Sequence, residues 1–428
     1  MEGTRRIIAW VAVALAPACG DGGSGAAPKG SDAAVEGSSS RDASPDGAPQ
    51  SDGSFDGPAS CTLPMASSLG SGVPRLTVAG DAPGMGGISD ASLFWPAASA
   101  TGFLAYTNTP MGLLETRLAR STDSGGTWSF VANVNTAGSA MFPAGGLVSC
   151  GAAASCPAVL VHEVPTLVVD PSDPDPSRQL KIVSDAYLEP AFGTASKFPT
   201  FLFGYFALQT SPDGTTWSSD TAVLGWSATP TNVSPPLPPV QANVQTAFPE
   251  LADCDLLLEP AMAIRPATSA TDAGAIDLAL SCVHLTNPSP TIRIVLLRST
   301  DHARTFEYVG VLLSTADATC LGSPSPAITG GDLFYVGTKE YLLASRLSPS
   351  QGQAGNVYRD CLVFAVDDSG AVSRDPQGHP DVLREIATTD GTAIGSCTYA
   401  EGAAKMGYVG NWGSTLPSSI FVSGIGAP

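Results

Sequence analysis

The stretch STDSGGTW at residues 121–128 recurs as SPDGTTW at 211–217 and as STDHARTF at 299–306, with a fainter copy, DDSG, at 367–370. An Asp carboxylate in such a stretch can accept hydrogen bonds from turn amides, Gly relaxes the turn, and the closing aromatic residue fills the gap between neighbouring sheets. Each copy therefore predicts a hairpin turn in a repeated sheet. The turn acceptors are Asp123, Asp213 and Asp301, and the closing aromatic residues are Trp128, Trp217 and Phe306.

A second repeat lies upstream of these turns, where an acidic or polar residue opens a short apolar strand. The five openers are Asp90, Glu163, Glu259, Ser323 and Glu401, separated by 73, 96, 64 and 78 residues. Further strand-like runs follow each opener. Five copies predict an all-β propeller of five four-stranded antiparallel blades, with six blades as the alternative. The run 75–79 would pair with the last strand and close the ring, which removes two exposed sheet edges.

The turn motifs resemble the Asp-box, S-x-D-x-G-x-T-W, of the sialidase (bacterial neuraminidase repeat) superfamily. The copy at 121–128 matches every defined position, and the copy at 211–217 is one residue shorter. The third copy has Ala303 where the pattern has Gly, which predicts modest strain if that turn needs a positive φ. The resemblance implies that each box joins the third and fourth strands of a blade, away from the chemistry.

Acidic residues at the openings of the inner strands are the candidates for catalysis. The innermost strands of a propeller line its channel, so Asp90, Glu163, Glu259 and Glu401 should converge on one funnel. Converging carboxylates repel one another, and one of them can keep its proton near neutral pH. Glycoside hydrolysis uses such an acid beside an ionised base or nucleophile. The structural alternative is that these carboxylates cap strands or pair with arginines, namely Arg117, Arg120, Arg293 or Arg298.

This arrangement is similar to the five-bladed glycoside hydrolases of the arabinanase, xylosidase and fructosidase type, whose acidic residues lie on successive inner strands. The resemblance implies that Glu163, in Glu-Val-Pro, is the acid and that Asp90 is the base or nucleophile. Glu259, followed by Pro260, would be the helper that shifts a pKa. Asp90 departs from the family pattern, because Ala91 stands where those enzymes have Pro.

Sialidase chemistry is a further alternative for the same funnel. That family uses a Tyr nucleophile assisted by a Glu, to which Tyr399 and Glu401 would correspond. Its first arginine usually lies in an R-I-P segment, whereas Arg75 lies in Val-Pro-Arg-Leu. The candidate substrate-binding residues are Arg75, His162, Trp226 and Trp412. The two tryptophans would stack on a sugar, or alternatively fill gaps between blades.

The N-terminal region predicts export and a lipid anchor. Arg5 and Arg6 precede the apolar run Ile7–Ala18 and then Cys19, so residues 1–19 resemble a bacterial lipoprotein signal whose lipidated residue would be Cys19. The alternative is simple cleavage after Ala18. Residues 20–60 are rich in Gly, Ser, Ala, Asp and Pro, which predicts a disordered tether before a single domain at 61–428. These features predict a bacterial envelope protein, held at the outer membrane only through its lipid.

Composition limits the partners and cofactors. The formal charge of −19 argues against nucleic acid, so the expected partner is a glycan or polysaccharide bound by a monomer. Eight cysteines besides Cys19 predict disulfides, and the short loop between Cys150 and Cys156 makes that pairing the one expectation. The cysteines and histidines have no zinc-site spacing, and no cofactor is indicated, although converging carboxylates would suit Ca²⁺ in the channel.

Two classes of function follow from these patterns. The first is a glycan-directed hydrolase that uses the funnel carboxylates. The second is a non-catalytic surface module that binds a glycan or a protein through the same funnel, and a purely structural envelope protein is a third. Carboxylate geometry separates them, because a glycosidase needs its acid pair roughly 5 to 9.5 Å apart and open to solvent.

Overall fold

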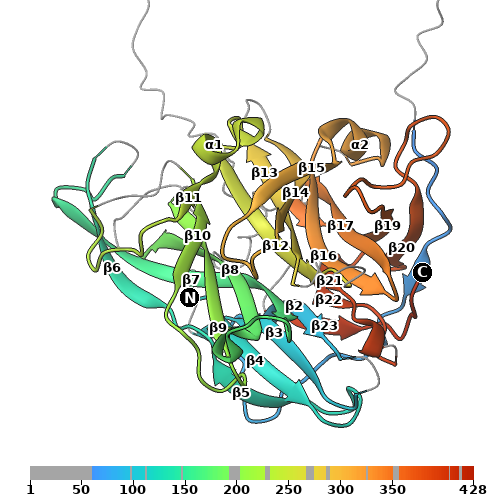
Figure 1. Ribbon diagram of the computed structural model, residues 1–428, viewed down its shortest axis with the longest axis horizontal. Coiled ribbons are helices and arrows are strands. Elements are labelled where there is room, and N and C mark those ends of the chain that lie inside the picture. Colours follow the sequence, from blue (N-terminus) through green and yellow to red (C-terminus); the bar gives the residue numbers. More distant parts are fainter. Residues whose placement is uncertain are drawn as a thin grey trace, which may run out of the picture. The chain divides into compact units, whose positions relative to one another are not determined.

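The structure is a computed structural model (Figure 1). It describes residues 60–96, 99–110, 113–145, 148–191, 203–226, 232–266, 274–285, 290–323, 326–349, 356–403, 405–413 and 417–428. Cys19, the predicted signal and nearly all of the predicted tether lie outside the described residues.

Five small antiparallel sheets are arranged as the blades of a propeller, so the prediction of five blades is confirmed and the alternative of six is wrong. Blade 1 contains β2 (Ile88–Phe94), β3 (Gly102–Asn108), β4 (Glu115–Ser121) and β5 (Ser129–Asn133). Blade 2 contains β7 (Ser155–Val169), β8 (Leu180–Pro190), β9 (Gly204–Ser211) and β10 (Thr221–Gly225), flanked by β6 (Gly138–Pro143) and β11 (Ala242–Asn243). Blade 3 contains β12 (Leu256–Ile264), β13 (Ile276–His284), β14 (Thr291–Ser299) and β15 (Glu307–Leu313).

Blades 4 and 5 complete the ring. Blade 4 contains β16 (Ile328–Val336), β17 (Lys339–Pro349), β19 (Cys361–Val366) and β20 (Val382–Thr388), with β18 (Asn356–Tyr358) beside β17 and β1 (Ser67–Leu69) beside β20. Blade 5 contains β21 (Ile394–Thr398), β22 (Val409–Trp412) and β23 (Ser419–Val422). The inner strands are β2, β7, β12, β16 and β21.

Short helices connect some of these strands. They are α1 (Val244–Ala247), α2 (Thr315–Cys320) and the 3₁₀ turns Pro176–Arg178, Pro249–Leu251 and Glu401–Ala403. In the part of the chain that the structure describes, no helix has the length and apolar character to span a membrane.

Two of the five predicted strand openers lie elsewhere. Asp90, Glu163 and Glu259 lie within inner strands β2, β7 and β12. Ser323 precedes β16 and donates its hydroxyl to two backbone carbonyls, and Glu401 follows β21 in a 3₁₀ turn. A polar residue near an apolar run does not by itself show where an inner strand begins. The bulge adds a residue to the strand and so shifts the alternation of its side chains between the two faces.

The segment before β2 closes the ring by crossing the outer strands of three blades. β1 pairs in parallel with β20 of blade 4, Arg75 forms an antiparallel bridge with Phe421 of β23, and Ala79 forms a parallel bridge with Ser129 of β5. The predicted pairing with the last strand is therefore confirmed at Arg75. The same run goes on to blade 1, so one segment covers the outer edges of blades 4, 5 and 1.

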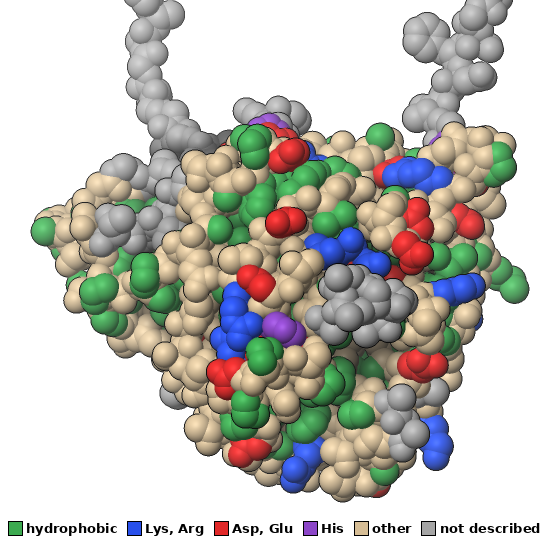
Figure 2. Space-filling model, viewed as in Figure 1, with side chains coloured by type: hydrophobic (Ala, Val, Ile, Leu, Met, Phe, Trp, Pro, Cys, Tyr) green, Lys and Arg blue, Asp and Glu red, His purple; other side chains and the backbone are tan. Residues whose placement is uncertain are grey.

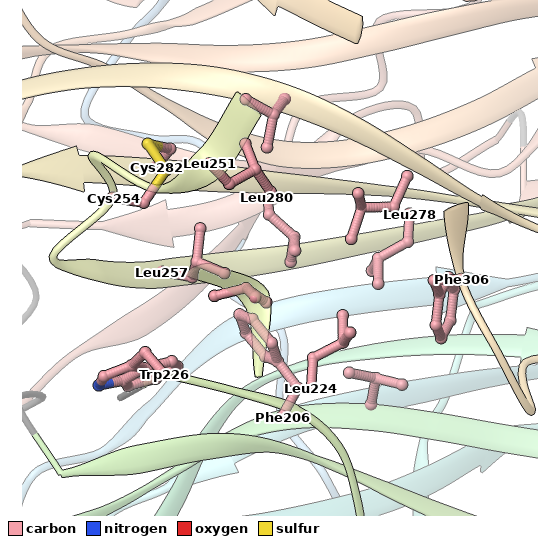
Figure 3. Packing of buried hydrophobic residues seen from close by; sticks show 14 of the residues in the cluster. Phe206, Leu224, Trp226, Leu251, Cys254, Leu257, Leu278, Leu280, Cys282 and Phe306 are labelled. Atoms are coloured by element: carbon pink, nitrogen blue, oxygen red, sulfur yellow. A yellow bond between two sulfur atoms is a disulfide. The ribbon is translucent and has the colours of Figure 1, made fainter. Parts of the chain in front are cut away.

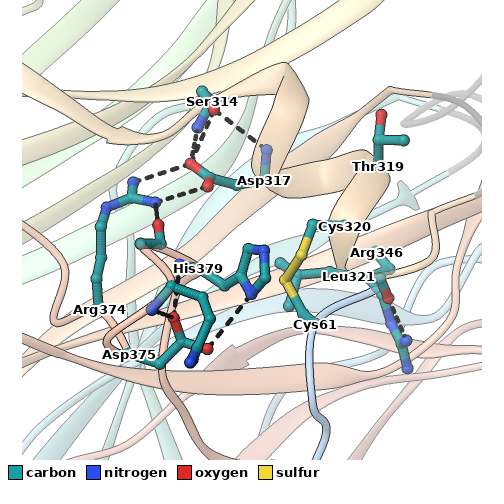
Figure 4. The surroundings of a disulfide bond; sticks show 12 residues. Cys61, Ser314, Asp317, Thr319, Cys320, Leu321, Arg346, Arg374, Asp375 and His379 are labelled. Carbon is teal, nitrogen blue, oxygen red and sulfur yellow. Dashed lines mark hydrogen bonds and ion pairs between the residues drawn. A yellow bond between two sulfur atoms is a disulfide. The ribbon is translucent and has the colours of Figure 1, made fainter. Parts of the chain in front are cut away.

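A disulfide fastens the start of this segment. Cys61 is bonded to Cys320 at the end of α2 (Figure 4). Beside it, Ser314 and Asp317 form the capping box that begins α2, and the Asp317 carboxylate accepts two hydrogen bonds from Arg374. The remaining pairs are Cys150–Cys156, as predicted, Cys254–Cys282 and Cys361–Cys397.

Both faces of a blade are buried, which explains why the strands are almost continuously apolar. In β13, Leu278 and Leu280 point toward blade 2, where they meet Phe206 and Leu224, while Ala279 points to the cluster shared with blade 4 (Figure 3). Alternate residues of one strand thus pack against two different neighbours.

The three turn motifs join the third and fourth strands of blades 1, 2 and 3. In the first, Asp123 accepts hydrogen bonds from the backbone and the hydroxyl of Thr127, at 2.9 and 2.8 Å. In the second turn Asp213 accepts the backbone N–H of Thr215. In the third, Asp301 accepts hydrogen bonds from the backbone and the hydroxyl of Thr305. Ala303 has a φ of 62°, so this Ala does occupy a conformation that favours Gly.

A β-bulge interrupts every inner strand at an equivalent place. In four of the strands the bulge residue has a positive φ, namely Asp90, Val164, Glu259 and Ser396. Because a bulge residue leaves the ladder, its N–H needs another acceptor, and a side chain of the neighbouring blade supplies it in three strands. These bonds run from Asp90 to Asn411, from Val164 to Thr107 and from Glu259 to Asp185. In β16, Gly330 lies just before the bulge and donates in the same way to Ser281.

Charged side chains also link blades at their rims. On the face shown in Figure 2, blue and red side chains lie beside one another without forming a continuous basic patch. Salt bridges in the described part of the chain include Arg304 with Asp173 and Arg374 with Asp317.

Removing the Cys61–Cys320 disulfide should destabilise the domain more than removing Cys150–Cys156. The first closes a loop of 259 residues and the second a loop of 6. The chain-entropy relation gives losses of about 5 and about 2 kcal/mol. Thermal unfolding of the two Cys→Ser double variants would measure this, and equal losses would show that the segment at the ring closure is held mainly by its backbone pairing.

Candidate functional site

Three of the predicted carboxyl groups do come together at the axis. Asp90, Glu163 and Glu259 lie at the bulges of three successive inner strands, and their side chains are 2, 2 and 3% exposed. Burial is the main cause that raises the pKa of each group. The charge of Asp90 further raises the pKa of both Glu163 and Glu259, so the three groups lie close enough to interact.

Asp90 is held by groups that favour its ionised form. Its N–H donates to Oδ1 of Asn411 at 2.7 Å, and Nδ2 of Asn411 donates back to Oδ1 of Asp90 at 2.8 Å. The hydroxyl of Ser89 donates to its Oδ2 at 2.9 Å. These donors lower the pKa of Asp90 and oppose the effect of burial. Its pKa is raised, whereas that of Glu163 is raised well above the usual range.

Each glutamate receives a hydrogen bond from a tyrosine, of which Tyr187 is buried and Tyr358 is half-buried. The hydroxyl of Tyr187, on β8, donates to Oε1 of Glu163 at 2.8 Å. The hydroxyl of Tyr358, on β18, donates to Oε1 of Glu259. The side chain of Tyr358 crosses from blade 4 and lies against the backbone of Gly395 in β21, because a Cβ at Gly395 would come within 2.2 Å of it. This close approach needs Gly at position 395.

Asp185 is a fourth carboxyl at the axis that the sequence analysis missed. It occupies the same place on the second strand of blade 2 as Thr107, Ser281 and Asn411 on theirs. A hydroxyl or an amide performs the same task there, which is to accept the N–H of the next bulge. Asp185 does so through Oδ2, at 3.2 Å from the Glu259 nitrogen, while its buried Oδ1 has no hydrogen-bond partner among the described residues. Comparing the second strands of the five repeats could have identified it.

Arginines do not neutralise these acids, so the predicted alternative of pairing with arginines is wrong for the described residues. Salt bridges instead join Arg117 to Asp81 and Glu115, Arg293 to Asp253, and Arg298 to Asp277. In the described part of the chain no salt bridge reaches Asp90, Glu163, Asp185 or Glu259. Several buried carboxyls without a counter-charge cannot all be ionised, so some of them hold protons at neutral pH.

Among the described residues, the axial carboxyl groups are not close enough together to form a group of three metal ligands. Among the described residues, groups of three ligand atoms within 4.8 Å of one another are found elsewhere, at Asp170, Asp173 and His302 and beside the Cys254–Cys282 disulfide. In the first group, Nζ of Lys181 lies 2.8 Å from Asp173 and 3.4 Å from Asp170, so a cation of the protein already occupies that position.

The remaining predicted residues are not part of the axial carboxyl cluster. Tyr399 is buried beside Phe334, and Glu401 is exposed beyond the end of β21. The prediction that Glu401 shares a funnel with the other acids is therefore wrong. Glu401 lies at the far end of the inner strands, because it follows β21 instead of opening it.

The predicted substrate-binding residues also have other partners than the axial carboxyl groups. Nε2 of the buried His162 lies 2.8 Å from Oδ2 of the half-buried Asp220. The guanidinium of Arg75 lies over the ring of Trp412 at 3.6 Å. Trp226 is 2% exposed and packs with Phe206 in the core between blades 2 and 3, which is the gap-filling alternative.

No protein-family model matches the chain, and no curated protein matches it by sequence. Similar solved structures include an alpha-L-arabinofuranosidase from Podospora anserina in complex with cellotriose, with a TM-score of 0.43 and 9% identity over 84% of this chain and 96% of that one. An arabinanase from Bacillus subtilis has a TM-score of 0.41 and 10% identity over 78% and 92%. A family 117 glycoside hydrolase from Zobellia galactanivorans has 0.40 and 12% over 77% and 78%.

Replacing Asp185 by Asn should flatten the pH dependence of stability. Burial raises the pKa of Asp185 well above its ordinary value of 3.8. The stability that this preference for the protonated form contributes is complete below pH 3.8 and is lost as the pH rises through the raised pKa. The Asn variant keeps an oxygen for the Glu259 N–H but cannot ionise. Its stability relative to the native protein should therefore rise as the pH increases from 5 to 8.

Melting temperatures measured across that range would test this expectation. Ser281→Ala is the matched control, because it removes a neutral acceptor at the equivalent place in blade 3. It should lower stability by the same amount at every pH. Parallel pH profiles for native protein and Asp185→Asn would mean that Asp185 does not titrate in the fold.

Proposed function

We propose that this propeller is a glycan-directed protein of the glycoside hydrolase type, with its chemistry at the axial carboxyl groups. The observation that carries the proposal is the set of buried carboxyls on successive inner strands, which interact with one another and have no described counter-cation. Hydrolysis of a glycosidic bond needs one carboxyl that holds a proton and one that is ionised, and unequal surroundings create that difference.

The hydrogen bonds support different roles for Asp90 and Glu163. Asp90 receives side-chain donors that favour its ionised form, so it is suited to act as base or nucleophile. Glu163 has a more strongly raised pKa, which suits the general acid. Glu259 is the helper in this proposal, because its charge state changes the field at the other two groups.

Loss of either principal carboxyl should abolish turnover. We expect Glu163→Gln and Asp90→Asn each to lower kcat by about 10²-fold or more, because removing a general acid or base has an effect of that size. The assay is hydrolysis of a panel of chromogenic glycosides and of plant and bacterial polysaccharides by the folded domain. Glu307→Gln, on the exposed outer strand β15, is the matched control.

Two results would contradict the assignment of roles. Activity that survives in both variants would place the chemistry elsewhere. Activity lost in Asp90→Asn but kept in Glu163→Gln would make another group, such as Glu259, the acid. Melting curves of each variant separate loss of chemistry from loss of fold.

A second candidate function is binding without catalysis, and the burial of the carboxyls favours it. With 2 to 3% of each side chain exposed, these groups are less open to solvent than a hydrolytic pair needs. In that case the whole panel would stay intact in the presence of folded protein. Retention of specific sugars on a glycan array would then identify the ligand.

Export and anchoring through Cys19 are part of the same proposal. All eight cysteines of residues 61–428 are paired, which is typical of an oxidising compartment. Expressed in a bacterial host, the full chain should partition into the membrane fraction, and mass spectrometry should find lipid on Cys19. Cys19→Ser should release the protein in soluble form, and an unmodified thiol on the mature native protein would contradict the anchor.

A further inference from the structure

A cavity lies on the propeller axis beyond the carboxyl groups. It has a volume of about 180 Å³, and all five blades line it. The lining comes from the second halves of β2, β7, β12 and β16 and from the residues that follow β21. None of Asp90, Glu163, Asp185 or Glu259 is among the lining residues. The axis therefore has a second hollow that is separate from the proposed catalytic site.

Rigid apolar side chains form most of its wall. Phe94, Met262 and Phe334 line it, together with Tyr399. Phe334 stacks on Tyr341 with centroids 5.3 Å apart and is tilted against Tyr399 at 4.9 Å. These rings are braced from behind, so the cavity is formed before any ligand arrives, which lowers the entropy lost on binding.

Two acidic groups line the cavity, and one of them is explained by the fold. At the place where blades 1, 2 and 5 have Ser92, Thr166 and Thr398, blade 4 has Asp332. Oδ2 of Asp332 accepts hydrogen bonds from Thr398 and from the Tyr399 backbone, and burial raises its pKa to about 8. Asp332 therefore joins blades 4 and 5 and is mostly uncharged at neutral pH.

Glu401 also links blades 4 and 5, but it does so from the surface. It is exposed, and its Oε2 accepts the Gly337 N–H at 2.9 Å, which holds the carboxylate at the rim between blades 4 and 5. In the described part of the chain it forms no salt bridge, and the cavity lining contains no Lys, Arg or His. A carboxylate held by the backbone thus stands at the rim of a cavity whose lining residues include no cationic side chain.

We propose that this cavity binds a small organic cation with an apolar body, whose ammonium or guanidinium group pairs with Glu401 while the body lies against the apolar wall. A carboxylate attracts such a group through charge, and the wall removes the apolar body from water. A carboxylate ligand would be repelled by Glu401. A sugar would bury hydroxyls against walls that offer them few partners. The proposal does not depend on the function proposed for the other end of the axis.

Titration calorimetry at pH 7 with three ligands of the same shape tests the choice of charge. Benzylamine should bind, benzyl alcohol should bind about fivefold more weakly, and benzoate should not bind measurably. Equal affinities for benzylamine and benzoate would overturn the proposal, as would a complete lack of benzylamine binding.

Variants place the binding at this cavity. Glu401→Gln keeps the acceptor for the Gly337 N–H and should weaken benzylamine about fivefold without affecting benzyl alcohol. Ala400→Leu, which fills the cavity, should abolish binding of both, and its melting curve shows whether it folds. Glu307→Gln makes the same charge change on β15, and Glu163→Gln makes it at the other end of the axis; both should bind like native protein. If Glu163→Gln alone lost affinity, the ligand would lie in the carboxyl cluster and this assignment would be wrong.

Discussion

The hydrogen bond from each bulge residue to the neighbouring blade is the contact on which the centre of the propeller depends. The bulge takes a backbone N–H out of its own sheet, and a buried N–H without an acceptor is costly. Thr107, Asp185, Ser281 and Asn411 meet that need for the next blade in the ring. Two residues beyond the bulge residues of blades 1, 2 and 5, the hydroxyls of Ser92, Thr166 and Thr398 accept a second set of N–H groups across the blade borders. The inner strands are therefore joined to one another by side chains, in the absence of a continuous ladder between blades.

The same bulges determine where the acids point. Asp90 and Glu259 are themselves bulge residues with φ values of 50° and 56°, a conformation that costs a non-Gly residue about 1 to 3 kcal/mol. The surrounding hydrogen bonds over-determine this geometry, so the fold tolerates the strain. Strained residues that carry ionisable groups at the centre of a fold are typical of functional sites, and here their positions follow directly from the way the blades are joined.

The two ends of the axis consequently differ in chemistry. At the bulges, acidic side chains lie close together without salt bridges among the described residues, and burial raises their pKa values. Downstream, the inner strands carry aromatic and aliphatic residues that leave a cavity with one exposed carboxylate at its rim. The ring is therefore suited to hold protons at one end and an apolar group at the other, although the same five strands build both.

Local sequence patterns by themselves determined the fold class, the three turns, the five repeats and the convergence of Asp90, Glu163 and Glu259. Each of these rests on contacts within a few residues or on regular spacing along the chain. Only the tertiary structure decided that Asp185 and Tyr358 belong to the axis, that Glu401 lies at the far end, and that Trp226 is core. Those positions depend on the exact bulge register and on which blade face meets which neighbour, and a one-residue shift in a strand reverses the direction of every side chain. Contacts between blades join residues far apart in sequence, such as Asp90 and Asn411, so no local pattern records them.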